Sequence, residues 1–452
     1  MTNKNLKGEY RKTLTLAVPV VFSQVGQLVV QFVDNAMVGR LGAVPLAGVA
    51  FAGNIFFFLF IFGIGIAIGL TPLVGELYAQ GRHRKSASYL QNSVILYLAI
   101  GIVICAVQFA VIPLFSHMGQ PGEVIEAGIP YYKYLAWSII PLMLFMAFKQ
   151  FLEGVGNTKV AMVITIVSNV VNVIFNYLLI YGKAGFPEMG AAGAGLSTLI
   201  SRILTPLLII GYFVLNQSSR RYLAFYSARN WSRKHIGSLL SVGLPISAQM
   251  TLEGGAFAIT GIMMGWFGTV ALAANQIAII MANMAFLIVI SLGSATTIRV
   301  SHAYGAQNFA GIRRVASGSF RIALSWNALI AVLFILCRTL LPRIFTTDAD
   351  VIAMTGSLLV FVGLFQLSDG MQATSLSVLR GMQDVKATSV IAFISYIVIN
   401  LPVGYLFAFV LGMGPQGLWM GYIFGLTIAA ALLYSRYRRI TSKLERKMKN
   451  EK

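Results

Sequence analysis

Charged side chains make up only 11% of this 452-residue chain, less than half of the roughly 25% found in soluble globular proteins. Cysteine is rarer still, with two residues inside apolar runs, which excludes a secreted disulfide-bonded scaffold. Disorder is excluded too, because disordered chains are poor in aromatic residues and 12% of this chain is aromatic. The remaining composition, 57% hydrophobic, is typical of a protein embedded in lipid.

Long apolar windows recur along the whole chain. A bilayer core needs about 20 apolar residues per helix. Twelve windows of this kind span residues 13–36, 46–75, 92–114, 130–151, 160–181, 192–215, 238–263, 270–297, 318–341, 352–379, 387–411 and 415–434. The first window follows a basic start, but no small-residue cleavage site comes after it, so we predict a retained helix rather than a signal peptide. The predicted fold class is an all-α, multi-pass membrane protein with 12 transmembrane helices.

Basic residues are distributed unequally between the two sides of this topology. Of the 34 Lys and Arg residues, 28 lie in the N-terminus, the even-numbered loops and the C-terminus, and five lie in the odd-numbered loops. The positive-inside rule therefore predicts a cell-membrane protein with both termini in the cytoplasm. Because the basic residues fall between apolar stretches, we expect no nucleic-acid partner. The basic tail at 435–452 is interpreted as a solvated end that fixes topology, with headgroup or partner binding as the alternative.

The two halves of the chain resemble one another. MVGRLGAVPLA at 37–47 recurs as MMGWFGTVALA at 263–273, with six of eleven positions identical at a shift of 226 residues. Parallel repeats of six helices are typical of transporters that rock two bundles about a central site, although a repeat is also compatible with an inert scaffold. We expect an N-terminal lobe at 1–216, a cytoplasmic linker loop at 217–236, a C-terminal lobe at 237–434 and a basic cytoplasmic tail at 435–452.

Three carboxylates interrupt the predicted helices: Asp34, Glu253 and Asp369 lie in spans one, seven and ten. A charged side chain at a helix centre costs about 2.5–3.5 kcal/mol on insertion scales, so such residues usually line an ion or substrate pathway. The alternative is a carboxylate satisfied by hydroxyls and amides within a helix bundle. At the repeat shift Asp34 aligns with Thr260 and Glu253 with Gln27, so each half is expected to have its own ion chemistry.

Asparagines on the fifth span are the expected partners of the first acid. Asn169, Asn172 and Asn176 lie on this span, and the last two are four residues apart and so share one helix face. A carboxylate with carboxamide oxygens is a hard-oxygen cluster suited to H⁺ or Na⁺. We therefore predict a cation-coupling site at Asp34, Asn172 and Asn176.

A second cluster is expected in the C-terminal half. Glu253 and Asp369 would form its core and are the candidate Na⁺ ligands, with Asn275 and Gln276 of the eighth span within reach. Phe257 lies one turn after Glu253, where its ring could face a cation or only pack against neighbours. Many Phe and Met side chains suit a cavity for flat, lipophilic cations, since methionine adapts to varied ligands.

Several motifs, taken in order on twelve spans with these three acids, resemble the multidrug and toxic compound extrusion (MATE) family, and its NorM-like branch in particular. The resemblance covers essentially the whole chain. Its motifs are QFVDNAMVGRLG at 31–42, GELYAQG at 75–81, SHAYGAQ at 301–307, EGVGNTK at 153–159, TLEGGAF at 251–257, ALAANQIA at 271–278 and LSDGMQATSLSVLRGMQD at 367–384.

The resemblance implies two six-helix bundles that form a V-shaped cavity and export drugs in exchange for inward Na⁺ or H⁺. It implies an N-lobe site and a C-lobe cation site, made by the residues that match the family: Asp34, Asn172 and Asn176, and Glu253 and Asp369. Phe257 is associated with the second site. Phe365 stands where some relatives have a tyrosine, which removes one oxygen ligand and leaves Na⁺ and H⁺ both open as the coupling ion.

The predicted function is therefore that of a multidrug efflux antiporter, not an enzyme, with no cofactor other than the coupling ion. The expected substrates are organic cations and dye-like or fluoroquinolone-like drugs, handled by a monomer in contact with membrane lipid. The alternative is a flippase for lipid-linked or other amphipathic metabolites, but a pyrophosphate cargo would favour several arginines and Arg202 alone lies within a span. An enzyme is disfavoured because the histidines lack ligand spacing and no P-loop or nucleophile elbow is present.

Overall fold

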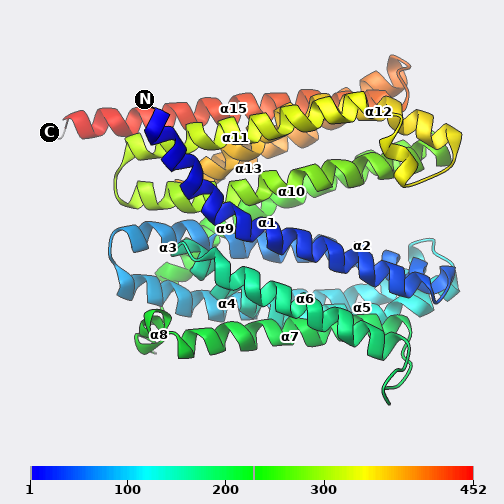
Figure 1. Ribbon diagram of the computed structural model, residues 1–452, viewed down its shortest axis with the longest axis horizontal. Helices are drawn as coiled ribbons and strands as arrows, with labels where there is room; N and C mark the ends of the chain where they lie inside the picture. Colours follow the sequence, from blue (N-terminus) through cyan, green and yellow to red (C-terminus); the bar gives the residue numbers. More distant parts are fainter. Residues whose placement is uncertain (1–2, 228–229, 451–452) are drawn as a thin grey trace. The chain divides into compact units, whose positions relative to one another are not determined.

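The structure is a computed structural model that describes residues 3–227 and 230–450, and every regular element in these ranges is a helix. Backbone contacts divide the chain into two compact units (Figure 1). We call residues 19–247 the N-terminal unit, and residues 1–18 with 248–452 the C-terminal unit. The division runs inside two long helices, α1 (Asn3–Gly39) and α9 (Arg233–Gly265), so each unit includes part of both.

The N-terminal unit is built around α5. Its elements are α1 from Pro19, α2 (Ala43–Ile68), α3 (Leu70–Ala79), α4 (His83–Val111), η1 (Ile112–His117), α5 (Gly122–Gly154), α6 (Thr158–Ile180), α7 (Ala191–Leu215), the short α8 (Gln217–Ala224), and α9 to Ser247. Helix α5 packs against α2, α4 and α7, and α6 packs against α7. The loop after α8 lies against α4, where Asn92 donates a 2.9 Å hydrogen bond to the Asn230 carbonyl. The segment between α7 and α9 is therefore held to the unit.

The C-terminal unit is built in the same way around α12. Its elements are the start of α1, α9 from Ala248, α10 (Thr269–Gly305), α11 (Phe309–Leu336), η3 (Leu341–Ile344), α12 (Ala349–Gly381), α13 (Lys386–Ala392), η4 (Phe393–Asn400), α14 (Leu401–Tyr405), η5 (Leu406–Val410) and α15 (Pro415–Asn450). Helix α12 packs against α10, α11 and α15. The basic segment from residue 435 continues α15, and Arg436 forms an ion pair with Asp384 at 2.8 Å.

Eleven helices in the described ranges are long and apolar enough to cross a membrane. Helix α9 is 33 residues long but is not among them, because polar side chains interrupt its apolar run: Ser238, Ser241, Ser247, Gln249, Thr251 and Glu253. With α9 as the seventh span, the twelve helices match the twelve predicted windows, and the prediction of a two-lobe, all-α membrane fold is confirmed.

The structure also preserves the repeat. Helices α1 and α9 end at Gly39 and Gly265, and a glycine at φ 124° (Gly42) or φ 100° (Gly268) precedes the next helix in each half. Such positive φ angles favour glycine because it has no Cβ atom. Deeper in each unit, the Thr71 hydroxyl donates to the Gln150 carbonyl at 3.1 Å, and the Thr297 hydroxyl, 226 positions later, donates to the Ser377 carbonyl at 3.0 Å. The two units therefore share this turn and this hydrogen bond, in keeping with the repeat in the sequence.

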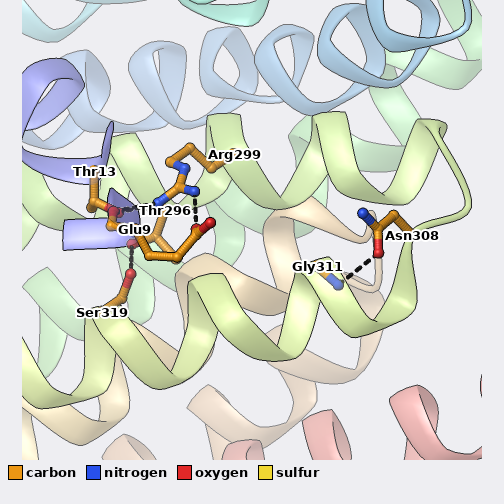
Figure 2. Close-up of polar contacts among 7 residues, drawn as sticks. All are labelled: Glu9, Thr13, Thr296, Arg299, Asn308, Gly311 and Ser319. Carbon is orange, nitrogen blue, oxygen red and sulfur yellow. Dashed lines mark hydrogen bonds and ion pairs between the residues drawn. The ribbon is translucent and has the colours of Figure 1, made fainter. Parts of the chain in front are cut away.

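A polar cluster attaches the start of α1 to the C-terminal unit (Figure 2). The Arg299 guanidinium on α10 forms an ion pair with Glu9, bonds the Glu9 carbonyl at 2.9 Å and donates to the Thr13 hydroxyl. Beside it, Thr296 donates to Ser319 on α11 at 2.7 Å. Hydrogen bonds that involve charged groups stabilise more than neutral ones, so the Arg299 cluster holds a segment that is remote in sequence.

Loss of this guanidinium tests the attachment. We expect Arg299→Leu to lower the free energy of unfolding by about 2 kcal/mol, since it leaves the Glu9 carboxylate without its partner, and to lower the melting temperature in detergent by about 5 °C. Arg321→Leu is the matched control, because Arg321 is exposed and makes a 3.5 Å hydrogen bond to Tyr10 of the same segment. Equal melting temperatures for both variants would contradict the role of Arg299.

Candidate functional site

The carboxylate of Asp34 on α1 lies in a hydrogen-bonded network within the N-terminal unit. The Asn176 amide of α6 donates to Asp34 and also to the Asn172 Oδ1 atom at 3.2 Å. From α7, the Ser197 hydroxyl donates to Asn176, and the Asn172 amide donates to Thr198 at 3.4 Å. Asn172 and Asn176 are both buried. The structure thus brings together the three residues predicted for this half.

The sequence places these asparagines on the inner face of α6. Residues 172 and 176 face α7, whereas Val167, Val170 and Ile174 on other faces are exposed, as expected of a helix whose outer side meets lipid. Asn169 does not join the network, because its Nδ2 atom is buried without a hydrogen-bond partner. The spacing of four residues, rather than the mere presence of asparagine, therefore identifies the partners of Asp34.

A carboxylate pair lies within the C-terminal unit. Glu253 on α9 accepts a 2.7 Å hydrogen bond from Gln249 and a further one from the Tyr396 hydroxyl of η4. Asp369, in the middle of α12, is 3% exposed and interacts electrostatically with Glu253. Arg380 of α12 donates to Gln249, one turn before Glu253, at 2.5 Å and interacts electrostatically with Glu253. Two predicted acids therefore share one site, with an amide, a phenol and a guanidinium around it.

Unpaired polar atoms are concentrated on α12 next to this carboxylate pair. The Oδ2 atom of Asp369 and both side-chain polar atoms of Gln366, one turn earlier, are buried without a hydrogen-bond partner. The Oδ1 atom of Asn327 on α11 is in the same state, while its amide bonds the Gln366 carbonyl at 2.7 Å. Helix α11 approaches closely here because Gly370 has no side chain: a Cβ atom would lie 2.2 Å from the Asn327 amide. Buried polar groups without partners are rare in proteins, so these oxygens suit an ion.

The aromatic candidates of this half pack against one another. Phe257 stacks on Tyr422 with ring centroids 4.6 Å apart, and Phe365 meets Trp419 and Tyr422 edge to face. The Trp419 indole donates to the Asn275 Oδ1 atom at 3.1 Å, so this amide bonds the aromatic group rather than a carboxylate. The ring of Phe257 thus packs in the hydrophobic core of the unit.

Adjacent positions on α10 differ in environment. Asn275 is buried, whereas Gln276 is exposed, as expected when successive residues of a helix point about 100° apart.

No group of three or more His, Cys, Asp or Glu residues gathers within residues 3–227 and 230–450. A cation bound at Glu253 and Asp369 would therefore use two carboxylates with neutral oxygens, a donor set that suits Na⁺ or a proton rather than a soft metal.

Seven residues of these sites were missed in the sequence: Gln249, Tyr396, Arg380, Ser197, Thr198, Gln366 and Asn327. Gln249 lies one turn before Glu253, so the i, i+4 spacing used for the asparagines could have found it. A tyrosine or serine in an apolar window is too common to be singled out. Their roles depend on how neighbouring helices are rotated, which the sequence alone does not give.

Twelve helices in two homologous units, each with carboxylates in its interior, define a membrane protein of the two-lobe repeat class. The sequence model of the MatE family matches the chain twice, over residues 19–178 and 245–406. The matches begin 226 residues apart, at the shift of the internal repeat. The chain belongs to the MatE family, which confirms the resemblance stated above.

Full-length relatives agree with this assignment. The multidrug resistance protein NorM of Photobacterium profundum is 33% identical over 440 residues, which cover 96% of both chains. A probable NorM protein of Mesorhizobium japonicum is 35% identical and covers 95% of this chain and 94% of its own. A solved structure of the Vibrio cholerae MATE transporter VcmN has the same fold, with a TM-score of 0.88 over 98% of this chain and 99% of its own, at 19% identity.

The Asp34 network generates a stability prediction. Asn176→Ala removes the donor to Asp34 and to the Asn172 Oδ1 atom, and it removes one acceptor of the Ser197 hydroxyl. Since each unsatisfied buried group costs about 1–3 kcal/mol, we expect the melting temperature in detergent to fall by about 5 °C or more. The control is Asn54→Ala, at an exposed position of α2. A variant at 176 as stable as the variant at 54 would show that the network does not hold α1 to α6.

Proposed function

We propose that this protein is a multidrug efflux transporter that exports lipophilic, mostly cationic drugs in exchange for Na⁺ or H⁺. The observation that carries the proposal is that both units keep carboxylates inside their membrane-spanning helices without a direct ion-pair partner. Within residues 3–227 and 230–450, Asp34, Glu253 and Asp369 take part in none of the ion pairs shorter than 4 Å. Acids kept at such a cost are typical of ion pathways, and the NorM relatives carry the name multidrug resistance protein.

The coupling follows from competition for these acids. An ion that enters from outside binds Glu253, Asp369 or Asp34 and favours one arrangement of the helices, and a drug that enters from the cytoplasm favours another. Since a ligand shifts a conformational equilibrium only through its different affinities for the two states, exchange requires that ion and drug exclude one another. The two units with their central helices α5 and α12 supply the rigid parts that such a change needs.

The C-terminal carboxylate pair is the stronger candidate for the main ion site. It combines two acids, the Tyr396 hydroxyl and the unpaired oxygens of Gln366 and Asn327. These oxygens would coordinate a Na⁺ ion, and the same carboxylates would bind a proton. Phe365 offers no oxygen and packs in the aromatic cluster, so it favours neither ion. We propose that Asp34 with Asn172 and Asn176 forms the second coupling site.

The remaining assignments follow the same proposal. The protein would act as a monomer in the cell membrane with both termini in the cytoplasm, and it would perform no chemical transformation. The start of α1 and the end of α15 lie at one end of the C-terminal unit (Figure 1), which suits an even number of crossings. A flippase for lipid-linked metabolites is the second candidate, and movement of a lipid-linked precursor into vesicles without drug flux would favour it.

Transport in inverted membrane vesicles tests the proposal. We expect ethidium to accumulate under a pH gradient alone or under a Na⁺ gradient alone, and the effective gradient identifies the coupling ion. Glu253→Gln and Asp369→Asn should each lower the initial rate at least tenfold at normal expression, because they remove the charge that binds the ion. Glu126→Gln and Asp350→Asn, which alter acids near helix ends at the loops, should retain the parent rate. Full transport by both variants of the carboxylate pair would refute the mechanism.

A further inference from the structure

One charged side chain in the middle of a membrane helix is not used by the coupling mechanism. Arg202 is the twelfth of the 25 residues of α7, so about 16 Å separate it from one end of the helix and about 20 Å from the other. Arginines near helix ends lower the cost of burial by extending their charge to the interface. Arg202 lies far from both ends, so its charge must be compensated within the unit.

Two aromatic rings and one hydroxyl fix the orientation of its guanidinium. Phe56 and Phe60 lie one turn apart on α2, with ring centroids separated by 5.5 Å. The Cζ atom of Arg202 lies 5.3 Å from the first centroid and 5.6 Å from the second. The Nη1 atom donates a 2.7 Å hydrogen bond to the Ser138 hydroxyl of α5. Side chains of α2 and α5 thus hold the guanidinium of α7 in place. Cation–π contacts of this kind are stronger when water is excluded.

These contacts leave most of the donors of Arg202 available. A guanidinium has five N–H donors, and one of them is used by Ser138. Arg202 has no acidic partner within 4 Å in the described ranges. Arg202 is half-buried, and none of its nitrogen atoms is among the fully buried atoms that lack a hydrogen-bond partner. The donors that Ser138 does not use are therefore not completely enclosed by protein.

Asp34 lies in the same electrostatic neighbourhood. It interacts with Arg202 through space, as does the Tyr131 phenol, but it is bonded to Asn176 rather than to the guanidinium. The N-terminal unit thus contains an acidic and a basic side chain that do not form a direct ion pair. Such a pair is complementary to a molecule that carries both charges.

We propose that Arg202 is a substrate-recognition residue that binds the carboxylate of zwitterionic aromatic molecules. This proposal rests on the transport function proposed above and specifies its substrate class. The carboxylate accepts two parallel hydrogen bonds from the guanidinium, a geometry that arginine provides and lysine does not. The aromatic body of the substrate lies against the half-buried ring of Phe60, and its cationic group is directed toward Asp34. Arg202 then selects among drugs, whereas the acids couple transport to the ion.

A pair of dyes that differ in one group tests this role. A rhodamine with a free carboxylate is a zwitterion, and its methyl ester is a cation of nearly the same shape. We expect Arg202→Gln to lower the ratio of acid to ester uptake in inverted vesicles about tenfold, and Arg202→Lys to give an intermediate ratio. The matched control is Arg84→Gln, since Arg84 also lies over a phenylalanine ring, 5.5 Å from Phe225, but is exposed at the start of α4. Its ratio should equal that of the parent.

The possible results separate the two proposals. An unchanged ratio in Arg202→Gln, or an equal loss of both dyes, overturns the recognition role while ethidium transport by the parent still supports drug efflux. If the parent moves neither ethidium nor either dye, the transport function itself is wrong. If Arg202→Gln does not accumulate in the membrane, fluorescence anisotropy of the acid dye with purified Arg202→Lys decides. Weaker binding of the acid with unchanged binding of the ester supports the proposal, and equal effects on both refute it.

Discussion

The cost of placing a charge in lipid governs this structure. Backbone polar groups within a bilayer must be bonded internally, which favours long helices, and each ionisable side chain on these helices needs a compensating environment. Glu9 and Arg299 compensate each other as an ion pair. Asp34 is compensated by an amide, and Arg202 by rings and a hydroxyl. The cost of a charge in lipid thus explains both the structural ion pair and the charged side chains that only neutral groups compensate.

Much of the fold could be predicted because it depends on local patterns. Apolar windows of sufficient length gave the twelve helices, and the repeated segment gave two homologous halves. The partners of Asp34 followed from the four-residue spacing of Asn172 and Asn176. The environment of Glu253 could not be obtained in this way, because Tyr396 and Arg380 lie on other helices and reach the site only through helix rotation. Asn275 shows the same limit: it was expected within reach of the carboxylate pair, but its hydrogen-bond partner is Trp419.

The two units show how a duplicated scaffold acquires different chemistry. The hydrogen bonds of Thr71 and Thr297 and the turns before α2 and α10 are retained in both halves. The ionisable groups are not. The N-terminal site has one acid bonded to an amide, whereas the C-terminal site has two acids near an arginine and the unpaired oxygens of Gln366 and Asn327. Packing therefore constrains the repeat, while residues that face polar interiors are free to diverge.

The attachment of the start of α1 to α10 has a consequence for biosynthesis. Arg299 is made 290 residues after its partner Glu9. At translation rates of about 5–20 residues per second, this interval lasts about 15 to 60 s. During that time α10 has not been made. The C-terminal unit is therefore complete only after the start of α1, which is made early, packs against helices that are made late. A nascent chain halted before α10 would therefore leave the start of α1 without its partner and more accessible to proteases.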